Sequence, residues 1–153
     1  MDKLPSNNPA IEYFRLWQNI NALYEIYAKA FGISSSTLAV VSIIYHNQEK
    51  CTQKTISEQG FLPKQTVNAV ITDFLKKGIV ELTESKSDRR TKTINLTISG
   101  KDYVNGITQK LINAENAAMN SLSIKQRTEL LKSTNIYYNY LKKSITNTLE
   151  EIS

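Results

Sequence analysis

The chain lacks most of the side chains that enzymes, metalloproteins and secreted proteins depend on. Among its 153 residues there is one cysteine and one histidine. A single cysteine cannot form an internal disulfide, which fits a reducing cytoplasm. One His and one Cys supply neither a metal-ligand cluster nor a nucleophile–base pair in a recognisable motif. We therefore expect a protein that is not an enzyme, with no metal and no cofactor.

Long apolar segments are also missing. The first nine residues, MDKLPSNNP, contain no apolar core of a secretory signal. The longest apolar stretch, residues 38–45, is interrupted by Ser42 and is far too short to cross a bilayer. There is no internal repeat, low-complexity segment or flexible linker. We expect one cytoplasmic domain over residues 1–153 that does not contact membranes.

Positive charge is concentrated in the middle of the chain, which carries +5 overall. Residues 50–92 contain nine Lys and Arg against five Asp and Glu, whereas the other 110 residues contain ten against nine. A local excess of this kind is expected where a segment faces a polyanion. A solvated lysine-rich face produces the same count, so charge alone leaves both interpretations open.

Six helices are predicted: the first, fourth and last from apolar residues at helical spacing, the others mainly from their caps. With their caps, five of these segments are residues 8–31, 34–46, 52–59, 97–122 (capped by Thr97 or Ser99) and 123–152. The fourth helix is expected to begin at Pro63 itself and to run to Lys77. Asn8, Ser34 and Thr52 are suited to be N-caps, and Ser123 with Gln126 has capping-box spacing. The second segment is apolar almost all round, which predicts a place in the core. Gly60 is expected to close the third helix.

The period then changes between the fourth and fifth helices. Residues 79–83 (IVELT) and 93–97 (TINLT) alternate apolar and polar, which predicts two half-buried strands joined by a charged hairpin tip. The order is short helix, turn, helix and hairpin, which is that of a winged helix-turn-helix. The expected fold is mainly α (α+β): a winged part at residues 34–97, flanked by helical dimerisation parts at residues 8–32 and 98–152.

The fourth helix is the candidate recognition helix. Its predicted core stripe is Val67, Val70, Ile71, Phe74 and Leu75. The opposite side and the N-terminal end then display Lys64, Gln65, Thr66, Asn68, Ala69 and Thr72. Gln and Asn pair bidentately with adenine, and Lys reaches guanine or phosphate in the major groove. A neutral surface patch is the alternative interpretation.

Two flanking segments complete the expected interface with double-stranded DNA. The preceding helix, with Thr52 and Gln53 at its start, braces the recognition helix and touches the DNA backbone. The hairpin carries Asp88, Arg89, Arg90 and Lys92. A wing of this kind reaches an adjacent groove, usually the minor one, where the negative potential attracts arginine.

The same residues carry a resemblance to a known family. Asp88, Arg89 and Arg90, followed by INLT at residues 94–97 and by Gly100, resemble the wing of the multiple-antibiotic-resistance-regulator (MarR) family. The Thr66–Val67 pair followed by LKKG at residues 75–78 agrees, and the flanking helices extend the resemblance over essentially the whole chain. One departure is the Leu62–Pro63 pair, which stands where family members often carry a Ser or Thr cap for a phosphate contact.

The resemblance implies a homodimer in which the first, fifth and sixth helices of both subunits interlock. It also implies that Arg90 enters the minor groove and that Asp88 orients the wing by pairing with a basic neighbour. A cleft for a small aromatic or anionic effector is implied beside Trp17, Tyr24 and the second helix. The protein would then be a transcriptional regulator, more often a repressor, that leaves a pseudopalindromic operator when the effector binds.

Three alternatives stay open at this point. A constitutive architectural DNA binder would sense nothing, and a winged-helix protein-interaction module would not bind DNA. An exposed pair of arginines in the wing disfavours the interaction module. Redox control through Cys51 is the third, but redox-sensing relatives place their cysteine in the first helix. Cys51 instead flanks the Thr52 cap opposite Ile56, which predicts a structural role.

Overall fold

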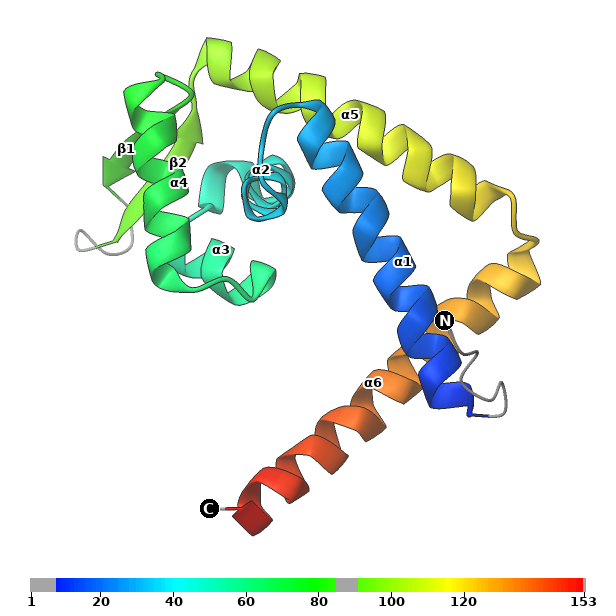
Figure 1. Cartoon of the computed structure of the whole chain (residues 1–153). Helices are drawn as coiled ribbons and strands as arrows, with labels where there is room; N and C mark the ends of the chain where they lie inside the picture. Colours follow the sequence, from blue (N-terminus) through cyan, green and yellow to red (C-terminus); the bar gives the residue numbers. More distant parts are fainter. Residues whose placement is uncertain (1–7, 85–90, 153) are drawn as a thin grey trace. The chain divides into compact units, whose positions relative to one another are not determined.

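The computed structural model describes residues 8–84 and 91–152 (Figure 1). In chain order the elements are α1 (Pro9–Ala30), α2 (Ser35–Asn47), the 3₁₀ helix η1 (Gln48–Lys50), α3 (Gln53–Gly60), α4 (Lys64–Lys76), β1 (Val80–Glu84), β2 (Lys92–Leu96), α5 (Ile98–Asn120) and α6 (Ile124–Ile152). The predicted fold class is confirmed: the chain is mainly helical and carries one two-stranded antiparallel sheet. Only η1 was not predicted.

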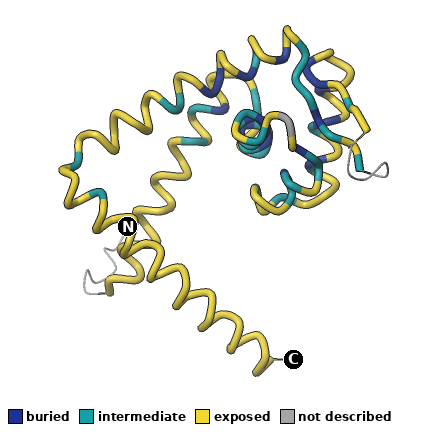
Figure 2. Tube along the Cα trace, turned by 180° about the vertical axis from the view of Figure 1, so that it is seen from behind, coloured by how far each residue is buried: buried dark blue, intermediate teal, exposed yellow. Residues whose placement is uncertain are grey.

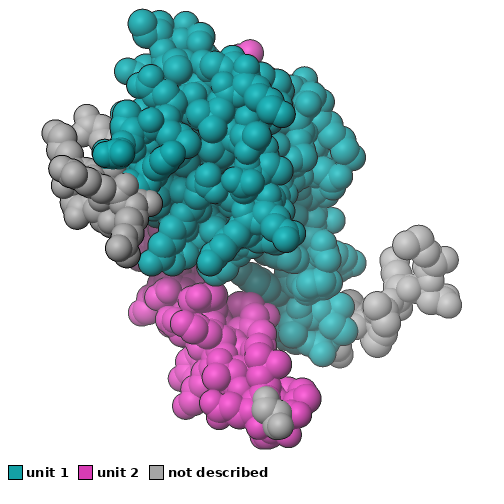
Figure 3. Space-filling view, turned by 90° about the vertical axis from the view of Figure 1, so that its left-hand side faces the viewer, with its two compact units in different colours: residues 1–109 teal, residues 110–153 magenta. Residues whose placement is uncertain are grey.

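The chain divides into two compact units, residues 1–109 and residues 110–153 (Figure 3). The first unit holds α1 to β2 and the start of α5. The second holds the rest of α5 and all of α6, whose described residues include none that is buried. Over residues 8–84 and 91–152, no single helix is long and apolar enough to cross a membrane, and α1 and α2 pass that test only as a pair bent by 88°.

Local capping chemistry sets the helix starts where the sequence predicts them. Asn8, Ser34 and Thr52 each accept a hydrogen bond, at 3.0 Å, from a backbone N–H in the first turn of their helix. Ser123 and Gln126 form a reciprocal capping box, with N–H to side-chain oxygen distances of 2.9 and 3.2 Å. These bonds satisfy donors that the helix itself leaves free.

The core of the first unit is built around α2, as its all-round apolar character predicts (Figure 2). Its buried residues are Leu38, Val40, Val41 and Ile44. On α4 the buried residues are Val67, Ile71 and Phe74. Leu75 was expected in this stripe but is 38% exposed. It follows buried Phe74 by one residue, which turns it about 100° round the helix to the edge of the stripe.

The end of α3 differs from the prediction. Gly60 is the last residue of α3, and Phe61 is the C-cap, with a left-handed backbone (φ 50°). Gly60 is needed for space instead, because a Cβ there would lie 3.0 Å from the Cδ1 of Ile43 and 3.2 Å from the side chain of Leu62. The glycine therefore lets α3 pack closely on α2.

The hairpin pairs β1 with β2 in antiparallel register from Val80 opposite Leu96 to Glu84 opposite Lys92. Each strand is displaced by one residue from its expected range, β1 toward the C-terminus and β2 toward the N-terminus. The backbone N–H of Ile94 donates to the carbonyl of Cys51 at 2.8 Å. This bond fixes the middle of β2 beside the start of α3.

The start of α5 is attached to the end of α4. The hydroxyl of Thr97 donates to the carbonyl of Gly78 at 2.6 Å and accepts the N–H of Gly100 at 2.9 Å, so Thr97 is the cap of α5. The backbone N–H of Thr97 donates to the carbonyl of Ile79 at 3.1 Å. Gly100 is buried against that same carbonyl, where any Cβ would overlap the oxygen.

This junction predicts opposite effects for two glycines of α5. Gly100→Ala should lower the free energy of unfolding by about 1–3 kcal/mol, because the added methyl forces Ile79 and α5 apart. Gly106 is the control, since nothing lies within 4 Å of its Cβ position. Gly106→Ala should raise that free energy by about 0.5–1 kcal/mol through its helix propensity. Denaturation at one fixed protein concentration measures both, and equal effects would contradict the described junction.

Candidate nucleic-acid interface

The turn between α3 and α4 is held by its own hydrogen bonds. The hydroxyl of Ser57 donates to the carbonyl of Leu62 at 2.7 Å, and the N–H of Leu62 donates to the carbonyl of Ser57 at 3.1 Å. On the other side of α3, the side-chain amides of Asn47 and Gln59 bond to each other at 2.9 and 3.3 Å. Helices α2 and α3 therefore form a rigid support for α4.

The predicted recognition residues lie together on the outer side of α4. Lys64, Gln65, Asn68, Ala69 and Thr72 are exposed, and Thr66 is half-buried at the first turn. α4 begins at Lys64, one residue later than expected, because Pro63 acts as its N-cap and forms no side-chain cap bond. Between Lys64 at its start and Asp73 and Lys76 near its end, the exposed positions are uncharged, so they present hydrogen-bonding groups of the length that base edges require.

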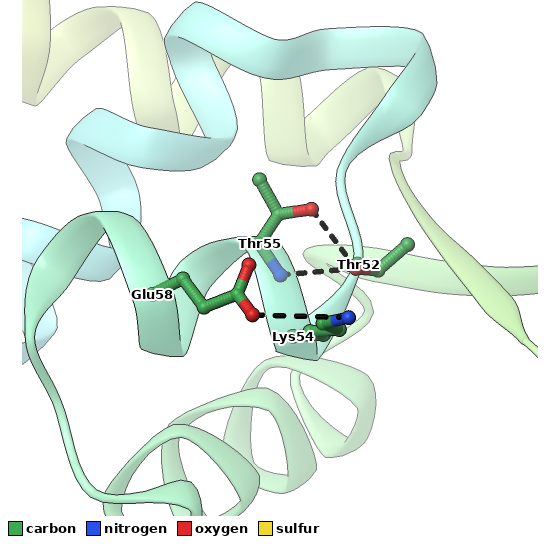
Figure 4. Close-up of polar contacts among 4 residues, drawn as sticks. All are labelled: Thr52, Lys54, Thr55 and Glu58. Carbon is green, nitrogen blue, oxygen red and sulfur yellow. Dashed lines mark hydrogen bonds and ion pairs between the residues drawn. The ribbon is translucent and has the colours of Figure 1, made fainter.

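The start of α3 is capped as predicted, and its contact with the DNA backbone stays a prediction. Thr52 and Gln53 are half-buried. The hydroxyl of Thr52 accepts the N–H of Thr55 at 3.0 Å and lies 2.9 Å from the hydroxyl of Thr55 (Figure 4). Thr52 thus serves first as a helix cap, while Gln53 faces an open groove.

That groove has a volume of about 300 Å³ and lies between α3 and the start of α4. Its lining residues are Gln53, Lys54, Ser57, Glu58 and Lys64. Sequence reasoning identified Gln53 and Lys64 but not the other three. A signal for Lys54 and Glu58 was present, because a Lys and a Glu four residues apart share one face of a helix. Their position next to Lys64 is visible only in three dimensions.

The wing is described in part. Lys92 is exposed at the start of β2 and stands opposite Glu84 in the register. The predicted contacts Asp88, Arg89 and Arg90 lie outside the described residues. Of the wing, the structure therefore places only the strands and their attachment to Cys51.

The two residues expected at an effector cleft lie on α1. Trp17 is 51% exposed, with its ring centroid 5.9 Å from that of Phe14. Tyr24 is half-buried. They are seven residues apart, roughly 10 Å along the helix axis. The effector cleft expected beside them and the second helix stays a prediction. Within residues 8–84 and 91–152, no group of three or more metal-ligating side chains comes together.

Cys51 is fully buried beside the cap of α3, and so is Ile56. Burial raises the pKa of the Cys51 thiol to about 11, since the surroundings disfavour the charged thiolate. The thiol therefore stays protonated at neutral pH, and thiolates rather than thiols react with oxidants. This agrees with the structural role that the sequence predicts.

Comparisons with known proteins bear on these features. Residues 31–91 match the model of the MarR family. The chain is 34% identical over 94 residues to the HTH-type transcriptional regulator PapX of Escherichia coli, covering 61% of this chain and 55% of PapX. It is 34% identical over 80 residues to PrsX of E. coli, covering 52% and 48%. The match spans about half the length of each of these relatives.

Solved structures extend the likeness over more of the chain. A MarR family regulator from Neisseria meningitidis is 26% identical, with a TM-score of 0.70 over 90% of this chain and 98% of that one. The complex of Staphylococcus aureus MepR with DNA has a TM-score of 0.66 at 20% identity, over 84% and 97% of the two chains, which is a likeness of fold. The helix-turn-helix with its hairpin makes this chain a winged-helix protein. Residues 31–91 match the MarR family, and the fold is similar to that of a MarR family regulator.

Proposed function

We propose that the chain is a cytoplasmic, homodimeric transcriptional regulator that binds a pseudopalindromic operator, as a repressor. The observation that carries this proposal is the exposed face of α4. Gln65, Asn68 and Thr72 project from a helix whose other side is anchored by buried Val67, Ile71 and Phe74. A rigid helix with short polar side chains on its free face suits readout in the major groove.

The proposed dimer is supported by apolar surface that one chain leaves uncovered. Along α1 the exposed large apolar residues are Ile11, Tyr13, Phe14, Leu16, Trp17, Ile20, Leu23 and Ile26. Along α6 they are Ile124, Leu130, Leu131, Ile136, Tyr137, Tyr138, Tyr140, Leu141, Ile145, Leu149 and Ile152. Exposed apolar surface of this extent marks an association surface. A second copy that covers them makes residues 1–153 one MarR-type domain with helical dimerisation parts at residues 8–32 and 98–152.

A two-fold dimer predicts a two-fold binding site. Light scattering should give about twice the 17.3 kDa chain mass. Footprinting on DNA from around the gene should protect an imperfect inverted repeat with half-sites about 10 base pairs apart, or a multiple of that. A monomer at micromolar concentration, or a protected site without two-fold symmetry, would argue against the proposed assembly.

Helix and wing should contribute different kinds of contact. Arg90→Ala should weaken binding to all sequences and reduce its salt dependence, because an arginine in the minor groove contributes charge and shape recognition. Gln65→Ala and Asn68→Ala should relax base preference at particular operator positions by about 1–3 kcal/mol. Asn105→Ala, at an exposed position of α5, is the control. Titrations over a salt series with mutated operators separate the two effects, and full affinity in Arg90→Ala would remove the wing from the interface.

The proposal includes release by a small aromatic or anionic effector, supported by half-exposed Trp17 and half-buried Tyr24 on α1. Such a ligand must bind the form with misplaced recognition helices more tightly. A tenfold loss of DNA affinity requires about 1.4 kcal/mol of coupling, and operator DNA must weaken ligand binding by the same factor. Calorimetry with phenolic acids, with and without operator, measures that reciprocity. Binding that ignores the operator would favour a constitutive DNA binder.

A further inference from the structure

The groove between α3 and α4 contains a carboxylate where a DNA-binding surface is expected to be positive. Lys54 and Glu58 form an ion pair along α3, with 3.8 Å between Nζ and Oε1 (Figure 4). Both side chains line the groove together with Lys64, the first residue of the recognition helix. Two cations and one anion therefore share a hollow at the end of α4 that recognition helices direct toward DNA.

The pair is weak and open to exchange. The side chains of Lys54 and Glu58 are 80% and 65% exposed. Exposed pairs four residues apart contribute little to folding stability, because water and salt screen them. Glu58 is thus not needed to hold α3, whose start is capped by Thr52 and whose end is bonded through Ser57 and Gln59. The negative charge of Glu58 instead acts on Lys54 and on any anion that enters the groove.

A DNA phosphate is the anion that fits this position. A lysine ammonium binds a phosphate oxygen as a point charge, and each phosphate that a protein neutralises releases condensed counterions. An approaching phosphate must displace the Glu58 carboxylate from the ammonium of Lys54. The negative charge of that carboxylate also repels the phosphate. The other polar groups of the groove, on Gln53 and Ser57, carry no charge.

We propose that Glu58 competes with a DNA backbone phosphate for Lys54. The groove is then a phosphate site whose positive charge, from Lys54 and Lys64, is partly offset by the carboxylate of Glu58. Its lining residues are Gln53, Lys54, Ser57, Glu58 and Lys64. The inference rests on the proposed DNA-binding function and adds a residue that limits affinity. Phosphate contacts carry no sequence information. Glu58 therefore lowers affinity for operator and non-operator DNA by the same factor.

The chain offers a matched control for this inference. Lys125 and Glu129 on α6 form a pair of the same spacing, with 3.9 Å between the charged atoms and exposures of 84% and 63%. Glu58→Gln and Glu129→Gln change the net charge equally. Glu58→Gln should tighten binding to both operator and unrelated duplex DNA about two- to fivefold per subunit, the effect of freeing one exposed lysine. The plot of log affinity against log salt should steepen by about one per subunit. Glu129→Gln should do neither.

Lys54→Gln supplies the second arm of the experiment. In the Lys54→Gln background the gain from Glu58→Gln should disappear, because the released partner is absent. Equal affinities of Glu58→Gln and Glu129→Gln would overturn the inference, and so would a gain that persists in full without Lys54. If Glu58→Gln instead loses affinity only for operators with one particular base pair, Glu58 contacts a cytosine rather than competing for a phosphate, and the inference is overturned. If the wild-type protein binds no duplex at all, the proposed function fails and this inference with it.

Discussion

Burial of α2 is the interaction on which the rest of the first unit depends. This helix places Leu38, Val40, Val41 and Ile44 in the interior, and α1, α3 and α4 all contact it. Removing such aliphatic side chains from water is the main favourable contribution to folding. Because α2 is apolar on nearly every side, its neighbours must surround it. That requirement turns α4 so that its polar face is left outside.

Features set by neighbouring residues were predictable from the sequence, and features set by packing were not. The caps at Asn8, Ser34 and Thr52 depend on chemistry within one turn, so they were placed correctly. Gly60 was misinterpreted as a turn residue. A glycine is needed there because the side chain of Ile43, seventeen positions earlier, leaves no room for a Cβ. A glycine near a helix end looks the same in sequence whether it supplies a turn or a gap.

The candidate site shows the same division. The polar face of α4 follows from the helical period alone, because the apolar stripe determines what lies opposite it. The groove beside Lys64 does not, since it requires α3 and α4 to be placed in space. Lys54 and Glu58 look in sequence like any solvated pair on a helix. Their charges matter for DNA binding only because Lys64 of α4 lies beside them in the groove.

The closed base of the hairpin has a consequence for how the protein can diversify. Thr97 is hydrogen-bonded to both Gly78 and Ile79, so the two ends of the β1–β2 hairpin are held together. Segments whose ends are tied together tolerate insertions and deletions, because the entropy of closing a loop grows only slowly with its length. The segment between Glu84 and Lys92, beyond the paired strands, can thus lengthen, shorten or change charge while the end of α4 and the start of α5 stay bonded. The contact of the wing with a DNA groove and the readout of bases by α4 can therefore evolve independently.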